Sequence, residues 1–221
     1  MCGRYSLAVE PDRILKFAGV KTGSLSWKPE PRIFPGQLAP ILRWASDGSP
    51  EVALLRWGLI PAWAATPPPR LLINARSETV AVRASFRGLT DRRRCLIPAD
   101  GFFDWHKEGS RRRPYRIARA DAGLLAFAGL WDRWQPAGEA PRETFVILTT
   151  RANGLIAPIH DRMPVILDDA GQVRWLQDEV PFGPLAEDLL KPCPDDRLRV
   201  DPIEESARRK GADATLALFP E

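Results

Sequence analysis

Cysteine and histidine are scarce in this chain, which has three cysteines and two histidines among its 221 residues. No two of them stand in a C-x-x-C or H-x-x-x-H spacing, so the sequence does not favour a zinc site, and we expect no metal and no cofactor. An odd number of scattered cysteines also argues against a disulfide framework, and a chain of this length can bury a core without one. The five residues are Cys2, Cys95, Cys193, His106 and His160.

Long apolar runs, glycine-rich phosphate loops and internal repeats are missing as well. Without an apolar run of about 20 residues the sequence predicts no transmembrane helix, and no secretory apolar region follows Met1. The absence of a G-x-x-x-x-G-K-[ST] segment argues against nucleotide hydrolysis. We expect a reduced, cytoplasmic protein with no membrane partner, associated with the nucleoid in a bacterium.

Positive charge is concentrated in the middle of the chain. The net charge is +4, but residues 70–119 hold thirteen basic residues against five acidic ones, a net of +8 that leaves −4 for the rest. Twelve of the thirteen are arginine, which suits bidentate phosphate contacts and stacks on rings. The clusters at 92–94 and 111–113 fit either polyanion contacts or solvated turns.

Short apolar or alternating runs bounded by turn residues predict many strands and few helices. The predicted strands cover residues 4–9, 40–44, 52–59, 71–75, 94–98, 114–118, 124–130, 144–149 and 164–167. The predicted helices cover residues 78–85, 173–176 after an Asp168 cap, 184–190 and 203–209. This pattern favours an α+β fold with a curled, mainly antiparallel, barrel-like β-sheet and a few peripheral helices. The Pro-rich stretch 64–69 predicts a surface loop, so we expect one domain over residues 1–221, in a monomer.

Cys2 carries the most specific chemistry in the sequence. The initiator Met is removed when the next side chain is small, so we expect the mature chain to begin with Cys2. A terminal cysteine is a 1,2-aminothiol, with an amine pKa of about 8 and a thiol pKa of about 8.5. The amine can condense with an aldehyde to a Schiff base, and the sulfur can then close a five-membered thiazolidine ring. The alternative is an ordinary frayed terminus.

Six sequence blocks between residue 1 and about residue 167 decide between these two interpretations. They are MCGRY at 1–5, WGLIP at 57–61, NARSET at 74–79, RCLIPADGFFDW at 94–105, FAGLW at 127–131 and HDRMPV at 160–165. In this order they resemble the SOS-response-associated peptidase (SRAP) family, which is similar to bacterial and eukaryotic proteins that shield abasic sites in single-stranded DNA. Six blocks together are far more specific than any one of them.

The resemblance implies a covalent DNA–protein crosslink at abasic sites in single-stranded DNA. Cys2 would condense with the ring-opened aldehyde of the abasic deoxyribose and form a stable thiazolidine. The resemblance further implies that Asn74 holds the terminal residue and the sugar, and that Asp104 and His160 move protons. An imidazole suits the acid–base work of opening the closed sugar. The structural alternatives are a turn amide for Asn74, a turn or cap residue for Asp104 and a buried histidine for His160.

Three arginines fall where the resemblance implies phosphate contacts. Arg76 and Arg162 would bind the phosphates that flank the lesion. Ion pairs with Glu78 and Asp161, which are close in sequence, are the alternative for both. Arg4, in the first block, fits a phosphate contact or an internal pair equally well.

Pro35 and Trp63 stand where the family has residues that wedge against or stack on bases at the lesion, although either residue could only pack. The sequence departs from the family in two places. Asp104 replaces the usual Glu and is one methylene shorter, and Phe34 and Arg32 replace the small and amide residues expected before Pro35. The first departure bears on the geometry of proton transfer, and the second on the shape of the loop near the lesion.

A different function class explains the same residues. A cysteine hydrolase would use Cys2 as nucleophile, His160 as base and Asp104 or Asn74 to orient the base, and it could remove Met1 from its own chain. This mechanism needs only the side chain of Cys2, whereas thiazolidine formation also needs the free α-amine. The sequence also leaves open a lyase activity at the abasic site and a non-enzymatic nucleic-acid-binding module.

Overall fold

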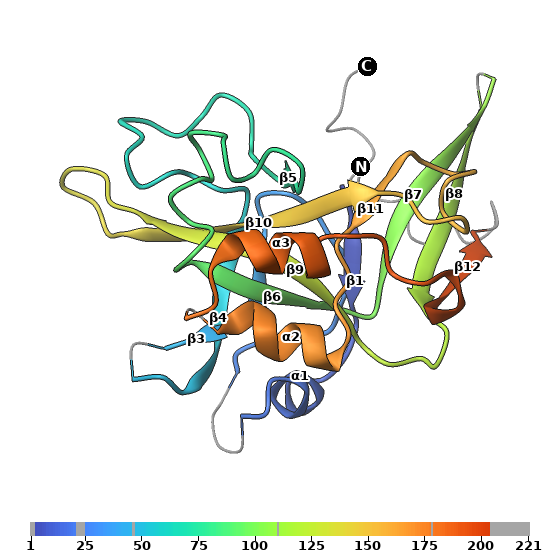
Figure 1. Cartoon of the computed structure of the whole chain (residues 1–221), viewed down its shortest axis with the longest axis horizontal. Coiled ribbons are helices and arrows are strands. Elements are labelled where there is room, and N and C mark those ends of the chain that lie inside the picture. The colour runs from blue at the N-terminus through green and yellow to red at the C-terminus, as the bar shows by residue number, and fades with distance from the viewer. Residues whose placement is uncertain (1–2, 21–24, 46, 110, 178, 204–221) are drawn as a thin grey trace.

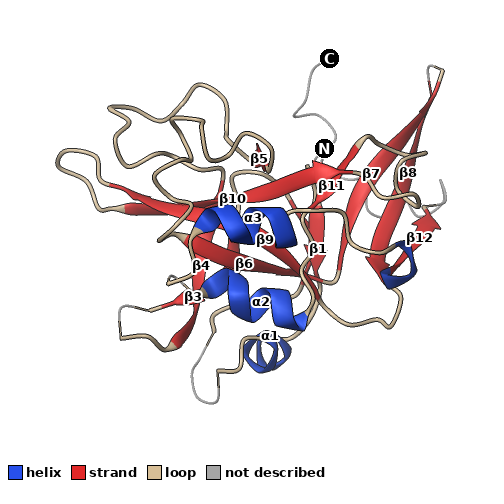
Figure 2. Ribbon diagram, viewed as in Figure 1, coloured by secondary structure: helices blue, strands red, loops and turns tan. Residues whose placement is uncertain are grey.

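The computed structural model describes residues 3–20, 25–45, 47–109, 111–177 and 179–203. Its strands form two β-sheets with short helices outside them (Figure 1, Figure 2). Sheet A has the order β12 (Leu198–Pro202), β8 (Arg111–Arg119), β7 (Gly101–Glu108), β1 (Tyr5–Leu7) and β2 (Glu30–Ile33). Sheet B has the order β11 (Arg162–Pro164), β10 (Arg142–Arg151), β4 (Pro50–Trp57), β3 (Leu38–Trp44), β6 (Arg94–Ala99) and β9 (Leu125–Trp134), and β5 (Asn74–Arg76) also pairs with β10.

Strand β10 closes sheet B into a ring, because it pairs with β9 as well as with β4. Its pairings with β4 and β5 are parallel, and the other ladders among the described strands are antiparallel. The predicted α+β fold with a curled, mainly antiparallel sheet is therefore confirmed, although the ring is not a true barrel. At Gly129 of β9 a Cβ atom would lie 2.3 Å from Ile97 Cδ1 and 2.8 Å from the Val146 carbonyl oxygen. Glycine thus allows β9 to approach both of its neighbours.

Buried aromatic rings fix strand β1 against sheet B. Tyr5 meets Trp57 edge-on at 5.1 Å between ring centroids, and it meets Phe127 at 6.1 Å. Trp57 stacks on Phe145, and all four side chains are fully buried. Such pairs contribute about 0.5–1.5 kcal/mol each beyond the burial of their area. Strand β1 is therefore held in a defined position.

The described helices are α1 (Pro11–Phe17), α2 (Asp169–Leu176) and α3 (Phe182–Leu189). The predicted cap of α2 is confirmed, since the Asp168 carboxylate accepts a hydrogen bond from Gly171 N–H at 2.8 Å. The predicted helix 184–190 corresponds to α3. Helix α1 was not predicted, although Pro11 at its first position is a common starting residue. None of these helices is long and apolar enough to cross a bilayer.

The helix predicted over residues 78–85 is wrong. This segment forms successive turns, with hydrogen bonds such as Val82 N–H to the Thr79 carbonyl and Phe86 N–H to the Arg83 carbonyl. Val80 is fully buried and Phe86 nearly so. Val80 is β-branched and therefore a weak helix former. The segment instead follows the path of turns that buries Val80 and Phe86. The helix predicted over 203–209 falls, from residue 204 onward, outside the described residues.

Every predicted strand overlaps an observed strand, but β2, β7 and β12 were not predicted. The omission of β7 matters most, because β7 carries Asp104. The outer half of β7 is polar and leaves the body of the protein with β8, so it lacks the alternating apolar residues that reveal a half-buried strand.

Candidate active site

The first described residues run alongside β7. Tyr5 pairs with Phe102 in antiparallel register, and Phe103 N–H donates to the Arg4 carbonyl at 3.0 Å, which extends the pairing toward the N-terminus. Asp104 follows Phe103 on β7 and is only 4% exposed. Its Oδ1 accepts a hydrogen bond from Trp105 N–H at 2.9 Å. A buried carboxylate thus lies beside the start of the described chain.

Cys2 lies outside the described residues, so its contacts with the predicted partners remain a prediction. The other two cysteines are described and buried. Burial raises the pKa of the Cys95 thiol far above its usual range, and burial is also the main cause that raises the pKa of Cys193 to about 11. Since the thiolate is the nucleophilic form, neither described cysteine suits nucleophilic chemistry near neutral pH.

Arg4 is held between two aromatic rings. Its guanidinium carbon lies 4.5 Å from the Phe34 ring centroid and 4.9 Å from that of Trp105. Burial, and then the positive charge of Arg32, lower the pKa of Arg4. Phe34, one of the departures from the family, therefore provides a stacking surface for Arg4, and Pro35 follows it in the turn before β3. A phosphate contact by Arg4 remains a prediction.

Asn74 begins β5 and is linked to the N-terminal strand through Trp57. The Trp57 indole N–H donates to the Ile73 carbonyl at 2.9 Å, and Ile147 N–H of β10 donates to the same carbonyl at 3.1 Å. Trp57 also packs on Tyr5. The backbone just before Asn74 is thus tied to β10 and, through the Trp57 ring, to Tyr5 of β1.

His160 ends a short turn that an internal amide stabilises. The Asn153 side chain accepts from Ile156 N–H at 3.0 Å and donates to the Cys193 carbonyl at 3.1 Å, and His160 N–H donates to the Ile156 carbonyl at 3.0 Å. The His160 Nδ1 atom accepts from Arg162 N–H at 2.9 Å.

Asp161 Oδ1 lies 2.8 Å from the same His160 Nδ1, a contact that would need a proton there. We favour the backbone hydrogen bond, because Arg162 N–H is fixed by β11 whereas the Asp161 side chain is 84% exposed. A nitrogen that accepts a hydrogen bond carries no proton, so the neutral imidazole has its proton on Nε2. The Nε2–H group of His160 can therefore donate a hydrogen bond.

Arg162 of β11 forms a bidentate ion pair with Glu78, with N–O distances of 2.6 and 2.9 Å. It also donates to the Thr149 carbonyl of β10 at 2.7 Å. The hydrogen bonds from Arg162 hold the pKa of Glu78 below its usual value. The ion pair with Glu78, which the sequence left open, is therefore present, and phosphate binding by Arg162 remains a prediction.

The register of β10 gathers several predicted site residues. Asn74 pairs with Ile147 and Arg76 with Thr149 on one side of β10, and Arg162 pairs with Arg151 on the other. Arg76 is exposed and, within the described residues, forms no ion pair. Asn74, Arg76, His160 and Arg162 thus surround the C-terminal end of β10, while Arg4 and Asp104 lie at the β1–β7 pair.

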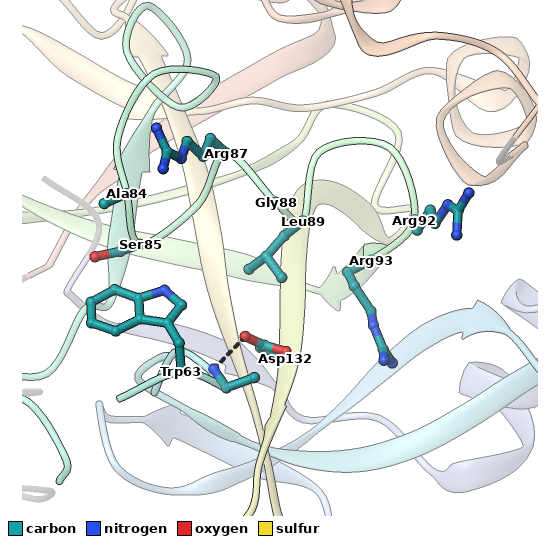
Figure 3. A pocket seen from close by; sticks show the side chains of 10 residues that line it. Trp63, Ala84, Ser85, Arg87, Gly88, Leu89, Arg92, Arg93 and Asp132 are labelled. Atoms are coloured by element: carbon teal, nitrogen blue, oxygen red, sulfur yellow. Dashed lines mark hydrogen bonds between the residues drawn. The ribbon is translucent and has the colours of Figure 1, made fainter. Parts of the chain in front are cut away.

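Trp63 lies apart from this group. It is 68% exposed and lines a cavity of about 640 Å³ (Figure 3). Its loop is anchored by Ala62 N–H, which donates to Asp132 Oδ2 at 2.7 Å. Asp132 pairs with Thr144 of β10, five residues before Thr149, or about 17 Å along the strand at about 3.4 Å per residue. Other cavity-lining residues include Arg87, Arg92 and Arg93.

The sequence did not reveal Asn153, which shapes the turn before His160, and it gave Glu78 only as one of two acidic alternatives to phosphate for Arg162. Glu78 falls inside the NARSET block, so its position gave a signal. Asn153 lies between blocks, and only its hydrogen bond to the distant Cys193 carbonyl shows its role.

Comparisons with known proteins agree on one family. The family model described as SOS response associated peptidase (SRAP) matches residues 1–209. The chain is 38% identical over 199 residues to the abasic site processing protein YoqW of Bacillus subtilis (strain 168), covering 87% of each. It is 30% identical over 198 residues to the abasic site processing protein YedK of Escherichia coli (strain K12), covering 87% of each. It is 32% identical over 236 residues to the abasic site processing protein HMCES of Xenopus tropicalis, covering 86% of this chain and 69% of the relative.

Solved structures share the fold. A protein from Bacteroides thetaiotaomicron matches with a TM-score of 0.82 and 28% identity, covering 93% of each chain. A protein from Bordetella bronchiseptica matches with a TM-score of 0.80 and 29% identity, covering 92% of this chain and all of the other.

Proposed function

This chain belongs to the SOS response associated peptidase family, whose similar members are named abasic site processing proteins, and we propose that it captures abasic sites in single-stranded DNA through a covalent bond to Cys2. In this proposal Met1 is removed, and both the α-amine and the thiol of Cys2 react. The lesion would then be shielded as a thiazolidine.

The chemistry begins with the closed sugar of the abasic site. Ring opening needs an acid at the ring oxygen and a base at the C1′ hydroxyl. In this scheme His160 donates a hydrogen bond from Nε2–H to the ring oxygen, because its Nδ1 accepts from Arg162 N–H, and a water molecule protonates that oxygen as the ring opens. The buried carboxylate of Asp104 supplies the base.

The covalent steps follow from the open aldehyde. The Cys2 amine adds to C1′ and gives a carbinolamine, which loses one water to form an imine. The Cys2 thiolate then adds to the same carbon, forming the C–S bond, while the imine nitrogen takes up a proton. The product is a five-membered ring in which both nucleophiles of one residue are bound to C1′.

The observation that carries the proposal is the pair of links that hold the N-terminal strand. The Phe103 to Arg4 hydrogen bond brings the start of the described chain to Asp104. The contact of Tyr5 with Trp57, and the hydrogen bond from Trp57 to Ile73, tie the same strand to the base of β5. These links tie the first described residues to β7, which carries Asp104, and to the backbone just before Asn74, and they support a reaction at Cys2.

A denaturing gel with single-stranded DNA that contains one abasic site tests the proposal. The mature protein should give a stable slow-migrating product, and Cys2→Ala should give none. A chain that keeps Met1 should also give none, because its Cys2 amine is part of a peptide bond. Normal crosslinking by the Met1-retaining chain would contradict the proposal, and peptide hydrolysis by that chain would favour the cysteine hydrolase.

A further inference from the structure

The outer end of the β7–β8 hairpin carries a concentration of positive charge. We define the basic hairpin as Trp105–Glu108 of β7 and Arg111–Pro114 of β8. It holds four cations, Lys107, Arg111, Arg112 and Arg113, against the single acid Glu108. In Figure 1 the two green strands extend away from the rest of the protein, and the three residues 111–113 and Lys107 are exposed.

The strand register places like charges opposite each other in this hairpin. Lys107 pairs with Arg112, so two cations face each other. Like charges that face each other directly destabilise an antiparallel pair. Within the described part of the chain no carboxylate forms an ion pair with Lys107 or Arg112, whereas some exposed cations elsewhere, such as Arg142 and Arg174, do have such partners. The described residues therefore offer no ion pair that compensates for this repulsion.

The two faces of the basic hairpin differ. Residues opposite each other share a face and alternate residues of a strand share a face, so Trp105, Lys107 and Arg112 lie on one side. Arg4 stacks on Trp105 and extends this row toward the N-terminus. The row is cationic and aromatic without an acidic member, and through Arg4 it continues to the first described residues of the chain.

The other face carries Asp104, His106, Glu108, Arg111 and Arg113 by the same register. Its charge is partly offset, because Glu108 lies directly opposite Arg111. The Arg113 guanidinium lies over the Tyr115 ring at 5.8 Å. A polyanion is therefore favoured on the Trp105 face.

We infer that the Trp105 face of the basic hairpin binds the sugar–phosphate backbone of the DNA strand on one side of the lesion, with Lys107 and Arg112 as phosphate ligands. The inference rests on the proposed function and adds a part of the DNA path to it. Arginine and lysine both bind phosphate, and a backbone contact carries no base preference. DNA binding on this flank should therefore be independent of sequence.

Binding of single-stranded DNA with a tetrahydrofuran abasic analogue tests the inference without crosslinking, because the analogue has no aldehyde. The variant Lys107→Gln/Arg112→Gln should reduce the slope of log affinity against log salt by about 1.4, at about 0.7 for each phosphate that is no longer neutralised. The matched control Arg111→Gln/Arg113→Gln removes two charges from the opposite face of the same hairpin and should change the slope much less. The swap Lys107→Arg/Arg112→Lys should keep the affinity.

Two single-stranded DNAs of equal length, one with the analogue near its 5′ end and one with it near its 3′ end, show which side of the lesion the basic hairpin binds. The Lys107→Gln/Arg112→Gln variant should lose affinity for only one of them, and its melting temperature should not fall, since a repulsive pair is removed. Equal losses in the two double variants, or an unchanged slope, would overturn the inference. Failure of the proposed function would instead appear as a wild-type protein that forms no covalent product with a true abasic site.

Discussion

At the scale of single residues, the proposed chemistry depends on the surroundings of Asp104, His160 and the cysteines. Asp104 is buried beside the start of the described chain, and His160 has its tautomer set by Arg162 N–H. The two described cysteines are buried and keep their protons. Reactivity is therefore expected at Cys2 alone among the three cysteines.

Asp104→Asn should slow adduct formation by about 10-fold to 10⁴-fold, the range for removal of an acid–base group, with little change in noncovalent DNA affinity. Asp104→Glu, which restores the family residue, should be tolerated. His160→Gln should also slow the chemistry, and the two effects should combine less than additively if both residues serve one proton-transfer unit. Single-turnover crosslinking across a range of pH measures these rates. A wild-type rate for Asp104→Asn at every pH would make the carboxylate structural.

Thiol labelling between pH 7 and about pH 9 should modify native protein at Cys2 only. Burial raises the pKa of the Cys193 thiol to about 11 and raises the pKa of Cys95 as well, so their thiolates are minor species in this range. Cys2→Ala should resist labelling when folded and take up two labels when unfolded, as counted by mass spectrometry. Because these two thiols lose their protons more readily in the unfolded protein, the free energy of unfolding should fall as pH rises above about 8.5, the pKa of an unfolded thiol. Rapid labelling of folded Cys2→Ala would show that the core is open.

The sequence was sufficient to propose the reactive residues, because each falls inside a recognisable block and has side-chain chemistry suited to its role. It was not sufficient to assign their partners. Arg162 could pair with Glu78, with Asp161 or with phosphate, and only the meeting of β11 with the segment after β5 selects Glu78 in the folded chain. Such choices depend on contacts between residues 84 positions apart.

At the scale of elements, β10 organises the site, since β5 and β11 flank its C-terminal end. The strands that flank β10 each bring one arginine proposed to bind phosphate. The two arginines differ, because Arg76 is exposed while Arg162 is held by Glu78 and Thr149.

Arg76→Ala should lower the salt slope for single-stranded DNA by about 0.7, the value expected for one phosphate. Arg162→Ala should do the same only if DNA replaces Glu78 as its partner. Glu78→Gln, which weakens that ion pair, should then raise noncovalent affinity in a binding titration across salt concentrations. An unchanged slope for either alanine variant would assign that arginine to a structural role.

Most strands were predictable from alternating apolar residues, and the α2 cap was predictable from Asp168. The turns over residues 77–92 could not be predicted. Their path depends on the burial of Val80, Phe86 and Leu89 against strands that are distant in the sequence. Strand β7 escaped prediction for the opposite reason, since its exposed outer half has no apolar face to reveal it.

At the scale of the whole molecule, the ring of sheet B joins β10 to the rest of the fold. The closure depends on parallel pairing of β10 with β4 and on close approach of β9 to β6 and β10. Local patterns in the sequence do not specify such nonlocal pairings, so a curled, barrel-like sheet could be predicted, but not which strands pair to close it.

Gly129→Ala should destabilise the protein by about 1–3 kcal/mol, the usual cost of overpacking. The new methyl group would collide with Ile97 and with the Val146 carbonyl oxygen, and that backbone oxygen cannot rotate away as a side chain can. Gly88→Ala is the matched control, because a Cβ there meets nothing within 4 Å. Denaturant unfolding of both variants gives the comparison, and equal stabilities would show that the ring is not tightly closed at β9.

The intact mass of the covalent product tests the central claim most directly. Protein without Met1, joined to abasic DNA, should have the mass of the two components less one water, since imine formation releases a water and ring closure releases nothing further. This product should form without a reducing agent and should gain no mass on borohydride treatment, because a thiazolidine has no imine to reduce. A product that retains Met1, or one that is trapped only by borohydride, would contradict the account.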